Sequence, residues 1–328
     1  MKIVITDCDQ NFMEPEENVI KKAGMSLSIH QVYKPSDVID VAKDADAIIC
    51  QYAQINEEVL NSLKNLKVVA RYGVGLDNID VDAATKKGIE VTYVPNFCFH
   101  DVANHAMSLI LNLSRNIENI NRLMRTESKN KPVDYGEMLK FMDNVERPNT
   151  QTIGIIGLGK IGKQVAKRAR SFGYSLLVCD PYLSEELINS YEGKKVGLPE
   201  LLKNSDFVTI HCPLNKETEK MIGEKELKMM KQTAYLVNTA RGKIIDEKAL
   251  INALKNKEIK GAGLDVLETE PIPQNHEFLK MDNVILTPHV SFYSNTSLLE
   301  LKTKVAEHAV NALTKKGEYP LANPEVLK

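Results

Sequence analysis

The sequence predicts an α/β protein built on parallel β-sheets, and two observations lead to this fold class. Short β-branched runs alternate with helical stretches along most of the chain, which is typical of βαβ units. This alternation occurs in two series, separated by a polar stretch at 124–150. A length of 328 residues is also enough for about two domains.

The first series contains four short apolar runs, each bounded by polar or turn-forming residues, which we expect to be strands. A long helix is expected over 101–118, because apolar residues recur there along one helical face. The stretch at 124–150 contains Pro132 and Pro148 and is expected to be an extended arm or connector. The strands are expected at 2–6, 47–50, 67–70 and 90–93, and shorter helices at 57–64 and 82–87.

The second series has the same alternation and ends in a helix expected over 296–313. Strands and helices follow one another without a short-period repeat, so the two series are expected to be two separate α/β domains. The strands are expected at 152–156, 176–179, 207–211, 235–238, 261–266 and 284–287, and the helices between them at 161–172, 198–202 and 246–256.

Composition and charge exclude several classes of protein. The 42 basic and 44 acidic side chains give a net charge of −2, which leaves no basic excess for nucleic acid or an anionic membrane surface. No stretch approaches the roughly 18 apolar residues of a membrane span.

The cysteines and the first residues indicate where the chain is found. Five cysteines lie far apart without CxxC spacing, which argues against a metal centre or a disulfide framework and favours a reducing compartment. Asp7 and Asp9 come too early for a signal peptide, so a cytoplasmic location is expected.

A glycine-rich turn in the second series carries the pattern GxGxxG at Gly157, Gly159 and Gly162. The pattern alone is a weak signal, but here a predicted strand precedes it and a predicted helix follows. Asp180 ends the next predicted strand, at about the 20-residue distance typical of dinucleotide-binding folds. An incidental glycine-rich turn would not be expected to have all three of these neighbours.

Each part of this turn has a physical reason. The first glycine permits the tight turn, the second lets the backbone approach a pyrophosphate, and the third lets helix and strand pack closely. The free N–H groups near Lys160 and Ile161 would then face the anion at a helix N-terminus. Asp180 can accept hydrogen bonds from both adenosine ribose hydroxyls and would repel a 2′-phosphate, so NAD is favoured over NADP.

Three polar residues follow three predicted strands of the same series: Arg241, Glu270 and His289. Ligands of open α/β sheets bind outside the carboxyl ends of the strands, so we expect these side chains to share one site. Taken singly, each has an ordinary structural explanation: a solvated arginine, a loop glutamate and a structural histidine.

The residue types fit the reduction of a 2-keto acid. Arg241 can hold a carboxylate bidentately and remains charged. Carbonyl reduction needs a proton donor that titrates near neutrality, which points to His289. Glu270 beside that imidazole would favour its protonated form.

With these motifs in place, the chain resembles the NAD-dependent D-2-hydroxyacid dehydrogenase family across nearly its whole length. The separation of Arg241 and Glu270 also matches the family pattern. Two shorter segments, VPNFCFHDVANHA and SFYS, are most similar to the subgroup of C-terminal-binding proteins and their bacterial relatives. The matching blocks, in chain order, are RYGVGLDNIDVDAATKKGI, GIIGLGKIGKQVAKRARSFG, HCPLNKET, LVNTARGKIIDEKAL, GAGLDVLETEP and TPHVSFYS.

The resemblance implies roles for individual residues. Arg241 would orient the substrate, Glu270 would support the catalytic histidine, and His289 would act as acid/base beside the nicotinamide. Substrate contacts are expected at Tyr52, Arg71, Val74, Gly75 and Phe292, although Tyr52 fits a half-buried core tyrosine equally well, and Phe292 stands where the subgroup usually has Trp. The remaining cofactor contacts are expected at Cys212, Pro213, Thr218, Thr239, Ala240 and Asp265.

The resemblance also implies the architecture. Two Rossmann-like domains, one flavodoxin-like and one dinucleotide-binding, would face each other across a cleft. Residues 1–98 and 289–328 would form the substrate-binding domain, and 99–288 the NAD-binding domain. The helix at 101–118 and the arm after it would build a homodimer, as in family members.

Related chains serve two other functions. The C-terminal-binding proteins indicate that this scaffold can serve as an NAD(H)-sensing corepressor, although a pure sensor need not keep Arg241, Glu270 and His289. Oxidation of formate or phosphite is the other alternative, and the accessory residues of those branches are not evident. The sequence does not decide which 2-hydroxy acid is the substrate: glyoxylate, hydroxypyruvate, phosphoglycerate or a bulkier acid.

Overall fold

The computed structural model describes residues 1–9, 12–127, 136, 139, 142 and 145–327. The chain divides into two compact units, Met1–Phe97 with Ser294–Lys328, and Cys98–Tyr293. Most of the expected arm at 124–150 lies outside the described residues. In the part of the chain that is described, no helix is both long and apolar enough to cross a bilayer.

The first unit contains a five-stranded parallel sheet in the order β2-β1-β3-β4-β5. This is the flavodoxin-like order, as expected. The long C-terminal helix α13 packs on α1 and on the central strands, so the end of the chain completes the unit that its beginning forms. The strands are β1 (Lys2–Ile5), β2 (Ser26–Ile29), β3 (Ala47–Cys50), β4 (Val68–Arg71) and β5 (Glu90–Tyr93); the helices are α1 (Glu14–Lys22), α2 (Pro35–Val41), α3 (Glu57–Ser62), α4 (Val81–Lys86) and α13 (Asn295–Thr314).

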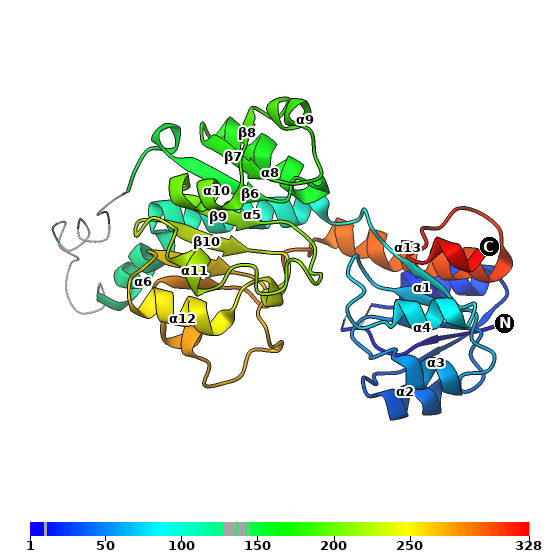
Figure 1. Cartoon of the computed structure of the whole chain (residues 1–328). Helices are drawn as coiled ribbons and strands as arrows, with labels where there is room; N and C mark the ends of the chain where they lie inside the picture. The colour runs from blue at the N-terminus through cyan, green and yellow to red at the C-terminus, as the bar shows by residue number, and fades with distance from the viewer. Residues whose placement is uncertain (10–11, 128–135, 137–138, 140–141, 143–144, 328) are drawn as a thin grey trace. The chain divides into compact units, whose positions relative to one another are not determined.

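The second unit contains a seven-stranded parallel sheet in the order β12-β11-β10-β9-β6-β7-β8. Figure 1 labels the strands from β10 to β8. Taken from β6, the order is that of the dinucleotide-binding fold with β12 added at one edge. The order in which strands are added reverses between β6 and β9, whereas all the strands stay parallel, and ligands of such sheets bind at this point. The strands are β6 (Thr152–Ile156), β7 (Ser175–Cys179), β8 (Gly193–Lys195), β9 (Phe207–Ile210), β10 (Tyr235–Asn238), β11 (Gly261–Leu264) and β12 (Val284–Leu286).

Helices cover both faces of this second sheet (Figure 1). Leu236 packs in a core with α10–α12, whereas its neighbour Val237 packs in a second core with α5 and α8, because successive strand residues point to opposite faces. The principal helices are α5 (Phe99–Arg115), α6 (Ile117–Glu127), α8 (Lys160–Ser171), α9 (Glu185–Asn189), α10 (Leu198–Asn204), α11 (Glu224–Leu227) and α12 (Glu247–Lys255).

Two sequence predictions are corrected here. The helix expected over 101–118 ends at Arg115, because Asn116 takes a left-handed conformation with φ of 53° and caps it. The segment 124–127, expected to begin an extended arm, instead completes the amphipathic helix α6. Strands β2 and β8 were not predicted, since their sequences SLSI and GKK lack a buried apolar run.

The chain returns from the second unit to the first between Tyr293 and Ser294, and the expected domain boundary at 288 and 289 lies five residues earlier. The segment between these positions is anchored in the second unit through Asp265, which accepts hydrogen bonds from the backbone N–H groups of Val290 and Ser291. Phe292 consequently belongs to the same unit as His289.

Candidate active site

The turn after β6 is shaped by glycine. Gly157 has φ of 88°, and its N–H donates to the Cys179 carbonyl oxygen at 2.9 Å. A Cβ at Gly157 would lie 2.7 Å from the Cys212 nitrogen. The turn therefore requires glycine for both its conformation and its contact with the end of β9.

The other two glycines of the pattern differ in what surrounds them. A Cβ at Gly162 would lie 2.2 Å from the Gly157 carbonyl oxygen, so packing explains this glycine. A Cβ at Gly159 would meet no atom of the described residues within 4 Å. Packing therefore does not explain Gly159, whereas a bound pyrophosphate at the N-terminus of α8 would. The residues present fit a dinucleotide.

Asp180 is held in place at the end of β7. One carboxylate oxygen accepts the Leu158 N–H at 2.9 Å and the other accepts the Tyr182 N–H at 3.0 Å. These bonds fix the carboxylate beside the glycine turn. Each carboxylate oxygen has a second lone pair, which is available to a ribose hydroxyl.

The loop after β9 is closed by its own side chains. The Thr218 hydroxyl donates to the Pro213 carbonyl oxygen at 2.6 Å and accepts the Asn215 N–H at 2.9 Å. Thr218 therefore shapes the loop, and its predicted contact with the cofactor stays a prediction. At the end of the strand, burial lowers the pKa of His211 to about 3, so this imidazole is neutral.

The turn after β10 carries Arg241. The Asn238 side chain accepts the Ala240 N–H at 2.9 Å and donates to the Arg241 carbonyl oxygen at 2.9 Å, which fixes the turn at both ends. The Thr239 hydroxyl is buried and has no hydrogen-bond partner among the described residues. An unsatisfied buried hydroxyl is costly, and a ligand at this strand end would satisfy it.

Gly242, which sequence reasoning missed, joins two of the predicted site segments. A Cβ at this position would lie 1.9 Å from the carbonyl carbon of Leu267, so the turn after β10 and the loop after β11 touch at their backbones. The signal in the sequence is the glycine that directly follows Arg241. Without it, the loop that carries Glu270 could not approach Arg241.

Glu270 and His289 form a direct pair. The Glu270 Oε2 atom lies 2.7 Å from His289 Nδ1, and Oε1 accepts the Leu267 N–H at 2.9 Å. Both side chains are about one-third exposed (35% and 29%), so they are anchored yet accessible. Since an ionised carboxylate can only accept, Nδ1 carries the proton and Nε2 is the ring nitrogen left for other chemistry.

The backbone of His289 is left-handed, with φ of 54°. This conformation costs a non-glycine residue roughly 1–2 kcal/mol and persists only where its surroundings enforce it. Here the His289 N–H donates to the Asp265 carbonyl oxygen at 2.8 Å. The Asp265 carboxylate accepts the N–H groups of Val290 and Ser291 at 2.9 and 3.0 Å. Asp265 therefore fixes the backbone that carries the imidazole of His289.

Asp265 was expected to contact the nicotinamide half of the cofactor. Its side chain is completely buried, and it also accepts the Thr287 hydroxyl at 2.6 Å. The contact with the cofactor stays a prediction, whereas the hydrogen bonds to the histidine loop are direct. Phe292 closes the same loop, with its ring edge-on to His289 at a centroid distance of 6.3 Å.

The first unit presents the other predicted substrate residues at the carboxyl edge of its own sheet. Tyr52 follows β3, is 38% exposed, and has its N–H held by the buried carboxylate of Asp7 at 2.5 Å. Asp7 was not predicted as a site residue, although it shapes the whole turn after β3.

The turn after β4 carries Val74 and Gly75, and Val74 is 47% exposed. Gly73, with φ of 111°, permits this turn, and a Cβ there would lie 2.3 Å from an Arg71 guanidinium nitrogen. The Arg71 side chain therefore lies against the turn that was predicted to receive a carboxylate.

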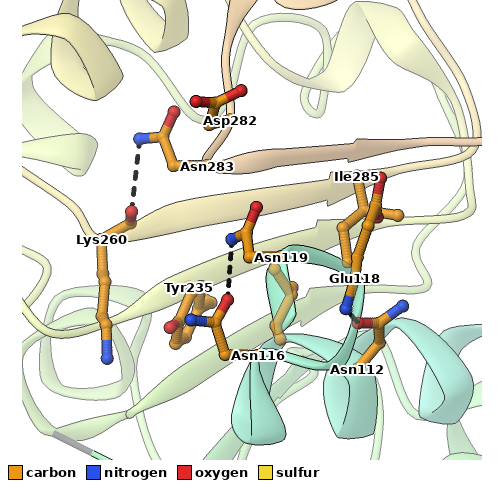
Figure 2. Close-up of a pocket in the computed structure, with 10 residues that line it drawn as sticks. Asn112, Asn116, Glu118, Asn119, Tyr235, Lys260, Asp282, Asn283 and Ile285 are labelled. Carbon is orange, nitrogen blue, oxygen red and sulfur yellow. Dashed lines mark hydrogen bonds between the residues drawn. The ribbon is translucent and has the colours of Figure 1, made fainter. Parts of the chain in front are cut away.

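A separate polar pocket lies at the amino ends of β10–β12 (Figure 2). It encloses about 140 Å³ and is lined by Tyr235, the first residue of β10, and by Asn283, just before β12. Asn116 and Asn119 bond to each other on the helical side at 2.7 Å. The pocket is at the opposite strand ends from Arg241 and His289, so it is not part of the candidate active site.

A family model for the "D-isomer specific 2-hydroxyacid dehydrogenase, NAD binding domain" matches residues 107–291. The chain belongs to the D-isomer specific 2-hydroxyacid dehydrogenase family. The matched range includes the glycine turn, Asp180, Arg241, Glu270 and His289. This dehydrogenase is therefore an NAD-dependent oxidoreductase that interconverts a 2-keto acid and its D-2-hydroxy acid.

Individual proteins of similar sequence or structure support this family assignment. A glyoxylate reductase of Korarchaeum cryptofilum is 42% identical over 89% of the dehydrogenase and 86% of the relative. A glyoxylate reductase of Pyrococcus furiosus is 40% identical over the same shares of the two chains. The crystal structure of a D-lactate dehydrogenase from Aquifex aeolicus, complexed with NAD and lactic acid, superimposes with a TM-score of 0.84 at 32% identity, covering 99% of this chain and 97% of that chain.

These relatives correct one prediction. Two short segments suggested the subgroup of C-terminal-binding proteins, whereas the similar named proteins are glyoxylate reductases. The two segments hold few residues, and similarity over nearly 300 residues outweighs them. Similarity along the whole chain therefore places the dehydrogenase beside glyoxylate reductases, in place of the subgroup that the two short segments suggested.

Proposed function

We propose that this dehydrogenase reduces a small, unbranched 2-keto acid, with glyoxylate as the first candidate. The observation that carries the proposal is the 2.7 Å pair of Glu270 and His289, anchored at the carboxyl edge of the second sheet. The similarity to glyoxylate reductases supports the choice of substrate. Phe292, half-buried beside His289, favours a small substituent at C2.

In this mechanism His289 is the acid and Glu270 supports it. The protonated Nε2 of His289 donates its proton to the carbonyl oxygen of the substrate, while Glu270 stabilises the positive charge through Nδ1. Bound NADH supplies the hydride that C2 receives. In the reverse direction, the neutral imidazole takes the hydroxyl proton.

The substrate carboxylate needs a cation and N–H donors. Arg241, next to the Gly242 contact, would hold and polarise it. Val74 and Gly75 of the first unit stay predicted substrate contacts. Tyr52, which follows β3, and Arg71, the last residue of β4, likewise stay predicted substrate contacts of the first unit.

Two further properties are inferred with this function. We infer a homodimer, because α6 presents exposed apolar side chains at Ile117 and Met124, which are 53% and 43% exposed. We infer a cytoplasmic location, because all five cysteines are free thiols. Light scattering of the purified protein tests the dimer directly.

The experiment is NADH oxidation with a panel of glyoxylate, hydroxypyruvate, pyruvate, phosphohydroxypyruvate and a branched 2-keto acid. We expect the highest kcat/KM with glyoxylate or hydroxypyruvate. In His289→Ala, turnover should fall by about 10²–10⁴-fold while NADH still binds. If the wild-type protein binds NADH tightly but oxidises it with none of these 2-keto acids, an NAD(H)-sensing protein would instead be favoured.

A further inference from the structure

A hydrogen-bond chain runs from helix α5 to the loop that carries His289. His105 Nε2 lies 2.9 Å from the Thr287 hydroxyl oxygen, and that hydroxyl lies 2.6 Å from Asp265 Oδ1. All three residues belong to the second unit. The mechanism proposed above gives no role to the side chains of these three residues.

The chain has a defined direction. A threonine hydroxyl has one hydrogen to donate, and the Asp265 carboxylate accepts it together with the Val290 N–H on the same oxygen. The Thr287 oxygen must then accept from His105, so Nε2 of His105 carries a proton. Each member consequently depends on the one before it.

The end of the chain is the group that holds the catalytic loop. Asp265 fixes Thr287, Val290 and Ser291 through its carboxylate. These residues flank His289, whose left-handed backbone needs such enforcement. A hydrogen-bond partner on α5 that orients the Thr287 hydroxyl therefore bears on where the imidazole of His289 stands.

His105 is not needed to dock α5. The helix packs through a separate apolar face that includes Ala106, Leu109, Ile110 and Leu113, all buried. His105 is off that face, with 23% of its side chain exposed. The hydrogen bond from His105 to the Thr287 hydroxyl explains a polar residue at this position better than core packing does.

We propose that His105 is a positioning residue, which acts through Thr287 and Asp265 to hold the imidazole of the acid His289 in its position. The proposal rests on the proposed role of His289. Loss of either the imidazole or the hydroxyl would let the loop relax by a fraction of an ångström. Misplacement of an acid group on that scale lowers kcat more than it changes substrate or cofactor binding.

The test compares His105→Leu, Thr287→Val and the double variant with the conservative Thr287→Ser. We expect kcat to fall by about tenfold in each of the first two, with the NADH dissociation constant and the melting temperature little changed. Thr287→Ser should restore most of kcat because it keeps the hydroxyl. The double variant should be only slightly slower than Thr287→Val, because His105 hydrogen-bonds to the Thr287 hydroxyl at 2.9 Å and otherwise approaches Asp265 Oδ1 only to 3.7 Å.

A matched control is His100→Leu, which removes an exposed histidine from the same helix; its ring contacts Arg168 and not Thr287. Amide hydrogen exchange across 287–292 provides a readout that needs no turnover, and we expect it to rise in His105→Leu but not in His100→Leu. Unchanged kcat and unchanged exchange in His105→Leu and Thr287→Val would overturn the proposal. Absence of turnover in the wild-type protein would overturn the proposed function, while the exchange would still test the positioning.

Discussion

Glu270 Oε2 lies 2.7 Å from Nδ1 of His289, and the two residues come from loops after neighbouring strands, β11 and β12. The carboxylate is itself fixed by the Leu267 N–H, and the imidazole by its left-handed backbone. The pair is therefore built before substrate arrives, which is the condition for efficient proton transfer.

Removal of the Glu270 charge should slow reduction without preventing it. Glu270→Gln can still accept from Nδ1 but no longer stabilises a positive imidazole, so we expect kcat to fall by roughly 10–10²-fold. Glu268→Gln is the matched control on the same loop, because Glu268 bonds to the Glu247 backbone and not to His289. Steady-state kinetics on both variants measures the difference, and equal losses would contradict the role of Glu270.

The glycines of the β6 turn should separate cofactor binding from folding. Gly159→Ala adds a methyl group into open space, so the melting temperature should hold while the affinity for NADH falls. Gly162→Ala places a methyl group 2.2 Å from the Gly157 carbonyl oxygen, so it should lower the melting temperature. Calorimetric titration with NADH and thermal melts check the pair. Undiminished NADH binding by Gly159→Ala would place the pyrophosphate elsewhere.

The cofactor preference should depend on Asp180. In Asp180→Asn, the charge that opposes a 2′-phosphate is lost, while an amide oxygen remains to accept one of the two backbone N–H groups. We expect the ratio of kcat/KM for NADH over NADPH to fall by about tenfold or more. A wild-type protein that binds NADPH more tightly than NADH would contradict the assignment.

Acid should destabilise the second unit through His211. Burial lowers the pKa of His211 from 6.5 to about 3, so the unfolded chain binds the proton more readily than the folded one. Stability is full above pH 6.5 and is lost as pH falls from there toward 3. Between pH 7 and pH 5 this amounts to about 1–2 kcal/mol.

Urea unfolding at pH 7 and pH 5 measures that loss. The lowered pKa of His308, also caused by burial, acts in the same direction in the first unit. In His211→Gln the extra loss at pH 5 should shrink, whatever the variant does to stability at pH 7. An unchanged pH dependence in this variant would remove His211 as the cause.

Sequence reasoning recovered most of the fold, and its errors have physical causes. Apolar strands such as Ala47–Cys50 and Phe207–Ile210 stand out because burial on both faces demands mostly apolar residues. The edge strand Ser26–Ile29 is half polar, so no periodic signal marks it. The break at Asn116 depends on one residue's left-handed conformation, which a helical pattern does not reveal.

The two α/β series, the glycine turn with Asp180, and the candidate residues Arg241, Glu270 and His289 could all be predicted from the sequence, because these features depend on residue types at short spacing. Tertiary structure alone decided that Gly242 brings two loops into contact, that Asp265 holds the histidine loop, and that His105 reaches Thr287 from another helix. Such contacts join residues up to 182 positions apart, so chain folding, and not local pattern, creates them.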